Sequence, residues 1–226
     1  MSTFLSLVAF TALAADPKPD KDGFVPLFPK DGVPEGWSVR EWSDLTKKVP
    51  DGNEWTVKDG VLTSGKNRGT WLVSDAEYAD FVLEFEIKLT EKGNSGVALR
   101  SPLKGDPAFD GMEFQVADLR YNPEAKESEL TGGIYRAVAP KKQAYKPTEW
   151  NSVRIELKGT TLKAKVNGEE QHDLDLSKQT EKVKRHDGTD AVALKDRPAK
   201  GHIGFQHLSR NNEPVTIRNA RIKELK

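Results

Sequence analysis

Side chains able to transfer protons and bind hydroxyl groups concentrate in two neighbouring stretches, residues 94–100 and 111–118. Side chains alternate along a β-strand, so residues two apart share a face. We therefore expect Arg100 on the polar face of the first stretch, and Glu113 with Gln115 on the polar face of the second. A carboxyl group transfers protons, a guanidinium stabilises developing negative charge, and an amide binds hydroxyls. Together they predict a ligand site on one open face of a β-sheet.

A second acid, Asp118, follows Glu113 after five positions, with Gln115 between them. In a regular strand the two acids face opposite sides, but a β-bulge between Gln115 and Asp118 would bring both to one side. Two carboxyl groups about 5 to 5.5 Å apart support retaining glycoside hydrolysis. The spacing resembles that of sandwich glucanases, which have an acid where this chain has Gln115.

Other polar and aromatic side chains complete the predicted site. Asn94, Gln206 and Tyr135 carry groups that can hydrogen-bond a ligand, and Trp71 is an indole that can stack on a sugar ring. His207, at the end of an expected strand, is a candidate acid. The sequence contains no His-x-His or His-Glu-x-x-His pattern, so it requires no cofactor, although carboxylates can hold a divalent metal.

The composition excludes several classes of function. The chain of 226 residues has 35 basic and 35 acidic side chains, so its net charge gives no reason to expect nucleic acid as a partner. No cysteine is present, which excludes disulfides and thiolate chemistry. The composition leaves the oligomeric state open.

The N-terminus predicts an export signal. Residues 4–15 are mostly apolar, and Ala12-Leu13-Ala14 has the small-x-small form that signal peptidase cleaves. The apolar run is shorter than the about 20 residues of a transmembrane helix. We therefore expect a signal peptide over residues 1–14, a charged linker over residues 15–22, and a secreted or periplasmic mature protein.

The remaining chain, residues 23–226, has the pattern of an all-β domain. Residues 81–89 alternate large apolar and mostly charged side chains, which is typical of a strand with one buried face. Asp59-Gly60 and Asn167-Gly168 are signals for two-residue hairpin turns. No stretch has a sustained helical period, so we predict a single antiparallel β-sandwich.

Several short motifs follow one another along the chain: Gly23-Phe24-Val25-Pro26-Leu27-Phe28, Asp80-Phe81, Gly93-Asn94-Ser95-Gly96-Val97-x-x-Arg100, Gly111-x-Glu113-x-Gln115-x-x-Asp118, Thr131-Gly132-x-Ile134-Tyr135, Glu149-Trp150-Asn151, Val166-Asn167-Gly168, Gly201-His202-Ile203-Gly204-x-Gln206 and Ile217-Arg218-Asn219. In this order they resemble the 3-keto-disaccharide hydrolase domain family, over nearly the whole mature chain. The resemblance implies a jelly-roll sandwich similar to concanavalin A-like lectins and glucanases, and a carbohydrate as partner.

The resemblance also implies a reaction, the cleavage of 3-keto-glycosides, in which a ketone at C3 acidifies the proton on C2. A base removes this proton, an enolate forms, the oxygen on C1 leaves, and water adds back. On this chain Glu113 is the expected base and Arg100 the group that stabilises the enolate. Asp118 or His207 is the expected acid, and a divalent metal is an alternative to Arg100.

One stretch departs from the family pattern. Gln206 is followed by His207-Leu208-Ser209, whereas the family usually has Asp-His-Gly there. Two alternatives to the hydrolase stay open, a non-catalytic carbohydrate-binding module and an ordinary retaining glucanase. The three differ in whether they cleave a 3-keto-disaccharide, its unoxidised parent, or neither.

Overall fold

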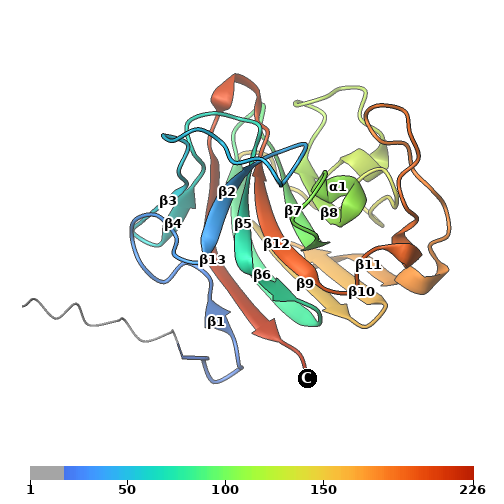
Figure 1. The fold of residues 1–226 in the computed structure, drawn as a ribbon, viewed down its shortest axis with the longest axis horizontal. Helices are drawn as coiled ribbons and strands as arrows, with labels where there is room; N and C mark the ends of the chain where they lie inside the picture. Colours follow the sequence, from blue (N-terminus) through green and yellow to red (C-terminus); the bar gives the residue numbers. More distant parts are fainter. Residues whose placement is uncertain (1–17) are drawn as a thin grey trace, which may run out of the picture.

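The computed structural model describes residues 18–226, and the expected signal peptide and the first part of the linker lie outside the described residues. Two antiparallel sheets pack face to face (Figure 1), which confirms the predicted all-β antiparallel sandwich. No helix among residues 18–226 is long and apolar enough to cross a membrane.

One sheet has eight strands in the order β11-β10-β9-β6-β13-β4-β3, and β1 pairs with β13 beside this path. Its strands are β1 (Val25–Pro26), β3 (Thr56–Lys58), β4 (Val61–Thr63), β6 (Phe81–Leu89), β9 (Asn151–Lys158), β10 (Thr161–Val166), β11 (Glu169–Asp175) and β13 (Val215–Glu224). Both expected hairpins form here, since Asp59-Gly60 joins β3 to β4 and Asn167-Gly168 joins β10 to β11.

The second sheet has five strands in the order β2-β5-β12-β7-β8. They are β2 (Trp37–Glu41), β5 (Thr70–Tyr78), β7 (Asn94–Ser101), β8 (Met112–Ala117) and β12 (Gly201–His207). The segment around Gly133 extends this sheet, because Gln115 N–H donates to the Gly133 carbonyl at 2.9 Å and Tyr135 N–H donates to the Glu113 carbonyl at 2.9 Å. A side chain at Gly133 would meet the Ser128 carbonyl oxygen at 2.5 Å, so this close approach requires glycine.

The helical elements are short. They are α1 (Pro107–Asp110) and the 3₁₀ turns Glu127–Glu129, Leu176–Lys178, Leu194–Asp196 and Arg210–Asn212. Asp106 precedes α1 and its side chain accepts the Ala108 N–H at 3.0 Å, while Pro107 occupies the first helical position. Figure 1 shows α1 beside β7 and β8, at one end of the five-stranded sheet.

The core lies between the sheets. Phe85 of β6 meets Phe205 of β12 edge to face, with ring centroids 5.4 Å apart. Leu83 and Ile87 from one sheet and Val97 and Phe114 from the other are fully or almost fully buried beside them. Fully burying each such side chain stabilises the fold by about 1.5–3 kcal/mol. Because the apolar residues of β7 and β8 point inward, their alternate residues face outward, and this outer face carries the site.

Candidate active site

A pocket of about 270 Å³ lies on the outer face of the five-stranded sheet. Strands β7, β8 and β12 form its floor, and the loop before β5, the start of α1 and the loop near residue 186 form its walls. Its lining residues are Trp42, Arg68, Asn94, Asp106, Ala108, Glu113, Gln115, Tyr121, Tyr135, His186, Gln206 and Leu208. The structure therefore brings together five residues that the sequence predicted for the site: Asn94, Glu113, Gln115, Tyr135 and Gln206.

Glu113 lies at the floor of the pocket and is 2% exposed. Its carboxyl group lies over Gly96 of β7, because a Cβ built on Gly96 would be 2.0 Å from Glu113 Oε1. That Oε1 atom is buried and has no hydrogen-bond partner within the described residues. Burial, together with the nearby Asp106, raises the pKa of Glu113 well above its usual value. The site thus favours Glu113 as a neutral carboxylic acid.

Two buried amides share this feature with Glu113. Asn94 is 5% exposed and Gln206 is 4% exposed, and the side-chain oxygen of each is without a partner among residues 18–226. Gln115 differs, since its Oε1 accepts the Val116 N–H at 2.8 Å. A buried acceptor without a partner costs about 1–3 kcal/mol. Unpartnered oxygens on three side chains that line one pocket indicate a ligand that donates several hydrogen bonds, such as a polyhydroxylated molecule.

The pocket contains a second acid, Asp106, which the sequence reasoning missed. Asp106 caps α1 and is 9% exposed. Burial raises its pKa to about 6, with a smaller contribution from the negative charge of Asp110. Asp106 is thus ionised at neutral pH in the same pocket where Glu113 favours its protonated form. The Asp-Pro pair was a readable helix-start signal, but nothing in it located the helix against β8.

Aromatic rings line the other side of the pocket. The His186 ring lies 5.8 Å from Trp42 and 6.0 Å from Tyr135, measured between centroids. Burial lowers the pKa of His186, so its imidazole is neutral at neutral pH. Burial raises the pKa of Tyr135, with a further contribution from Glu113, so the Tyr135 hydroxyl keeps its proton and can donate it to a ligand. Trp42 and His186 were not among the predicted site residues.

The prediction that Arg100 lies beside Glu113 is wrong. Arg100 has φ +48°, which breaks the alternation at the end of β7. Its buried guanidinium donates to the Ala79 carbonyl at 2.6 Å, the Gly159 carbonyl at 2.9 Å and Asp80 Oδ1 at 2.9 Å. Arg100 therefore holds loops together away from the pocket.

The guanidinium that lines the pocket belongs to Arg68, in the loop between β4 and β5. Its Nη2 donates to the Leu208 carbonyl at 2.8 Å and to the Tyr121 hydroxyl at 3.2 Å. Both partners also line the pocket, so these contacts fix Arg68 at its rim.

His207 and Trp71 are also placed differently from the prediction. His207 points into the core, where its Nε2 lies 3.1 Å from the Glu213 carbonyl and its ring meets Trp55 edge to face. Its neighbour Gln206 faces the pocket, and adjacent residues of a strand face opposite sides. Trp71 is fully buried in the cluster on which Trp42 packs, and its indole N–H donates to the Trp42 carbonyl at 3.1 Å. Trp42 therefore takes the position that the sequence assigned to Trp71.

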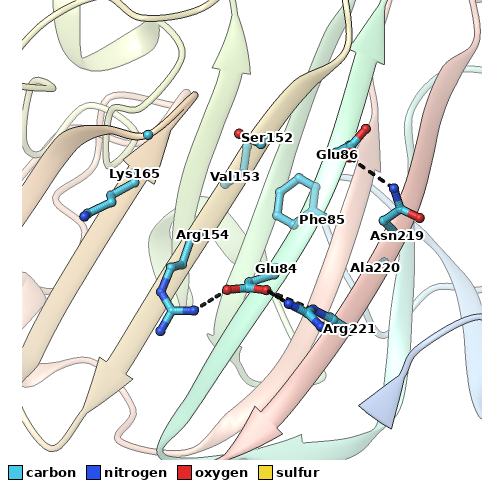
Figure 2. Close-up of a pocket in the computed structure, with 11 residues that line it drawn as sticks. Glu84, Phe85, Glu86, Ser152, Val153, Arg154, Lys165, Asn219, Ala220 and Arg221 are labelled. Atoms are coloured by element: carbon cyan, nitrogen blue, oxygen red, sulfur yellow. Dashed lines mark hydrogen bonds and ion pairs between the residues drawn. The ribbon is translucent and has the colours of Figure 1, made fainter. Parts of the chain in front are cut away.

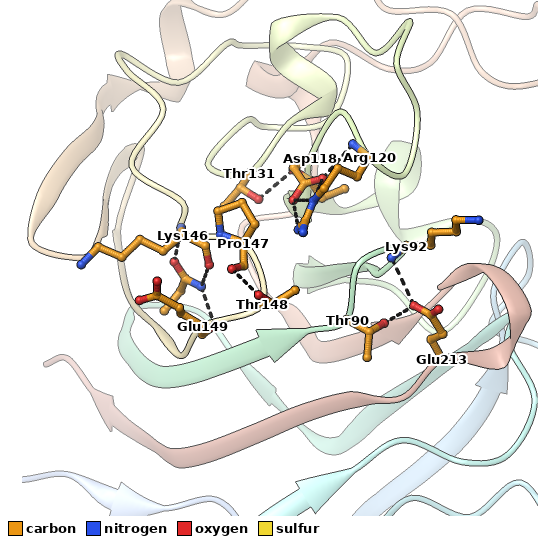
Figure 3. Close-up of polar contacts among 12 residues, drawn as sticks. Thr90, Lys92, Asp118, Arg120, Thr131, Lys146, Pro147, Thr148, Glu149 and Glu213 are labelled. Carbon is orange, nitrogen blue, oxygen red and sulfur yellow. Dashed lines mark hydrogen bonds and ion pairs between the residues drawn. The ribbon is translucent and has the colours of Figure 1, made fainter.

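Asp118 lies in an adjoining hollow, outside the pocket that contains Glu113. Arg120 donates to its Oδ1 through Nε at 3.0 Å and to its Oδ2 through Nη2 at 2.5 Å, as Figure 3 shows. The expected pairing of Glu113 with Asp118 is thus absent, and Asp106 is the acid that shares the pocket of Glu113. Across residues 18–226, no group of three or more His, Cys, Asp or Glu side chains is arranged to hold a metal ion.

Two buried carboxyl groups and several amides in an open-face pocket of a β-sandwich are side chains suited to a carbohydrate, and the comparisons with known proteins support a carbohydrate-active class. Residues 23–223 match the model of the 3-keto-α-glucoside-1,2-lyase-like domain, and the chain belongs to this family. A relative from Bacteroides thetaiotaomicron, named 3-keto-disaccharide hydrolase, is 26% identical over 91% of this chain and 80% of its own length.

Two solved structures from Parabacteroides distasonis, both assigned as glycosyl hydrolases, are similar. One superposes with a TM-score of 0.72 at 27% identity, covering 89% of this chain and 99% of its own. The other has a TM-score of 0.69 at 22% identity, covers 91% of this chain and 95% of its own, and supports the fold alone.

Proposed function

We propose that this protein cleaves 3-keto-glycosides in the pocket that contains Glu113 and Asp106. The observation that carries the proposal is the pair of buried carboxyl groups with raised pKa values, surrounded by oxygens that lack hydrogen-bond donors. Two acids whose environments separate their protonation states are the usual basis of acid–base catalysis. The named activity of the Bacteroides relative supports the 3-keto substrate.

In the first step we assign the base to Asp106 and the acid to Glu113. The sequence made Glu113 the base, but its burial favours the protonated form at neutral pH, whereas the lower pKa of Asp106 leaves it ionised. Asp106 removes the proton from C2, and the electron pair of that bond forms the enolate of the C3 ketone. Arg68 at the rim stabilises the negative enolate oxygen in place of Arg100.

In the second step the enolate expels the oxygen on C1, which takes the proton of Glu113 and leaves as an alcohol. The product in the pocket is then a 1,2-unsaturated 3-keto sugar. Water adds at C1, giving one proton to the Glu113 carboxylate, while protonated Asp106 returns its proton to C2. Both carboxyl groups are restored, and the net reaction is hydrolysis of the glycosidic bond.

Sugar binding in this proposal uses the remaining lining residues. The unpartnered oxygens of Asn94 and Gln206 accept hydrogen bonds from sugar hydroxyls, and the rings of Trp42 and His186 provide apolar contact for a sugar face.

The predicted leader over residues 1–14 is the basis for proposing that the reaction takes place outside the cytoplasm. N-terminal sequencing of exported protein checks this location.

The test is incubation of the full mature chain with a 3-keto-disaccharide and, separately, with its unoxidised parent. We expect cleavage of the ketone alone, because only a ketone at C3 makes the C2 proton acidic. In heavy water, deuterium should enter C2 of the product because the proton held by the Asp106 carboxyl exchanges with solvent before it returns, whereas a displacement at C1 places no deuterium at C2. Cleavage of the parent without deuterium at C2 would favour a retaining glucanase, and binding without cleavage would make the protein a sugar-binding module.

A further inference from the structure

A second, shallower hollow adjoins the pocket. It has a volume of about 160 Å³ and includes Asp118, Asn122, Ala125, Glu129 and Arg136 among its lining residues. Four further residues line both hollows: Asn94, Gln115, Tyr121 and Tyr135. The two hollows are therefore neighbours on the same face of the five-stranded sheet, separated by one shared wall.

The walls of this second hollow are held by charge-assisted contacts. Arg120 binds both carboxylate oxygens of Asp118 (Figure 3), and Arg136 Nε donates to Glu129 Oε1 at 2.9 Å. Bidentate and charge-assisted hydrogen bonds fix the geometry of their partners. These contacts leave a rigid hollow with both donors and acceptors and with its charges paired.

At the shared wall lies the buried side-chain oxygen of Asn94, which is 95% buried as a residue and has no partner among the described residues. The backbone N–H and carbonyl of Asn94 pair with Ser209 and Leu208, whereas its side-chain oxygen receives no donor from the described chain. A ligand that crosses from one hollow to the other would pass this atom. The geometry thus provides a polar acceptor where two units of one ligand would join.

We propose that the second hollow is the subsite for the leaving group, and that it binds a single uncharged, hydroxyl-bearing unit such as one sugar ring. This inference rests on the proposed function, because the ring that reacts must lie beside Glu113. The paired charges favour a neutral polar unit over an anionic or apolar one, and the small volume favours one ring over a longer chain.

The test fills the hollow without touching the residues assigned to proton transfer. Ala125 lines the second hollow but not the first, and it is half-buried, so Ala125→Phe should fold. Ala125→Leu is a smaller version in case the aromatic ring disturbs the loop, and Ala199→Phe, at an exposed position, is the matched control. Each variant is assayed with a 3-keto-disaccharide and with a methyl 3-keto-glucoside, whose methyl leaving group does not reach the hollow.

For the disaccharide we expect kcat/KM to fall about tenfold to a hundredfold in Ala125→Phe, by less in Ala125→Leu, and not at all in Ala199→Phe. For the methyl glycoside we expect less than about a twofold change in every variant, since the reacting ring is bound as before. Equal losses for both substrates, or no loss for the disaccharide, would overturn the subsite.

Failure of the proposed reaction gives a different result. If the wild type cleaves neither substrate, the proposed activity is wrong, and only the affinity for unreacted sugars then tests the subsite. Calorimetry should then show tighter binding of a disaccharide than of its monosaccharide, and Ala125→Phe should remove the difference. A difference that persists in Ala125→Phe, or no difference in the wild type, would refute the second hollow as a sugar subsite.

Discussion

The outer faces of the two sheets both carry charged residues and a hollow, and they differ in how their polar atoms are satisfied. On the eight-stranded sheet the hollow is about 570 Å³, roughly twice as large as the pocket of Glu113. Figure 2 shows Glu84 there between Arg154 and Arg221, and Glu86 beside Asn219. The two carboxylates of this hollow, Glu84 and Glu86, thus have partners on the neighbouring strands.

The five-stranded sheet has the smaller hollow, and it is lined by buried polar atoms that lack hydrogen-bond partners in the described chain. Glu113, Asn94 and Gln206 each keep a buried oxygen without a partner in the described chain, and two carboxyl groups there have raised pKa values. A surface ion pair contributes about 0–1 kcal/mol and marks no function, whereas perturbed buried acids cluster at functional sites. The larger of these two hollows therefore lies on the face whose carboxylates are paired, and the buried oxygens without partners lie on the other face.

The same substitution on the two faces gives the sharpest test of this comparison. Glu113→Gln should lower kcat on a 3-keto-disaccharide about 10²- to 10⁴-fold, because it removes the proton that the leaving oxygen needs. Its unfolding free energy should stay the same or rise, since the new amide N–H₂ group can donate to the neighbouring oxygens. Steady-state kinetics and chemical denaturation measure the two effects.

Glu84→Gln is the matched control. It should leave kcat within about twofold and cost about 0–1 kcal/mol of stability, because its ion pairs are partly exposed. Comparable losses of activity in both variants would remove the distinction between the two faces.

Asp106→Asn should lower activity about a hundredfold or more and change the pH profile. A carboxylate base must be ionised to accept a proton, and Asp106 has a pKa of about 6. Wild-type activity should therefore rise with pH through about 6, and the rate of the variant should lack this rise. Asp187→Asn, an exposed neighbour of His186, is the control and should keep the wild-type profile. An unchanged profile in Asp106→Asn would exclude it as the base.

The same variant has a stability signature with a defined sign. The pKa of Asp106 is raised in the fold from 3.8 to about 6, so the folded state binds its proton more tightly than the unfolded state. Ionisation therefore destabilises the wild type as pH rises from about 4 to about 6. Because Asn still caps α1, Asp106→Asn should be more stable than wild type at pH 7, by up to about 3 kcal/mol, and this gain should shrink toward pH 4.

Gly96→Ala tests whether the position of Glu113 matters. The added Cβ would lie 2.0 Å from Glu113 Oε1, so the carboxyl group must move, and a displacement of this kind costs about a hundredfold in rate. Gly204→Ala is the control on the same face, because its Cβ would come no closer than 3.3 Å to a neighbouring atom. In a Glu113→Gln background Gly96→Ala should add little, and an additive loss would mean that the glycine acts independently of Glu113.

The sequence by itself determined the fold class and the composition of the pocket floor. Strand alternation and hairpin turns are local properties, so the sandwich and the burial of one face of β6 were predicted correctly. The same periodicity placed Glu113 and Gln115 together on the outer face of β8. On β12 the prediction did not apply this rule, since it placed the adjacent Gln206 and His207 in one site, and the structure puts only Gln206 in the pocket.

Only the tertiary structure decided what surrounds that floor. Arg100 left the pocket because one residue with φ +48° turned its side chain to Asp80, and no local pattern signals that backbone conformation. Asp106 and Arg68 line the pocket because loops fold over the sheet. Arg68 contacts Leu208, which is 140 positions away in the sequence. Contacts at such separation depend on the packing of the whole chain, which the spacing of residues in one segment does not contain. The sequence therefore determined which residues share the outer face of β8, and packing determined which acid and which cation lie beside them.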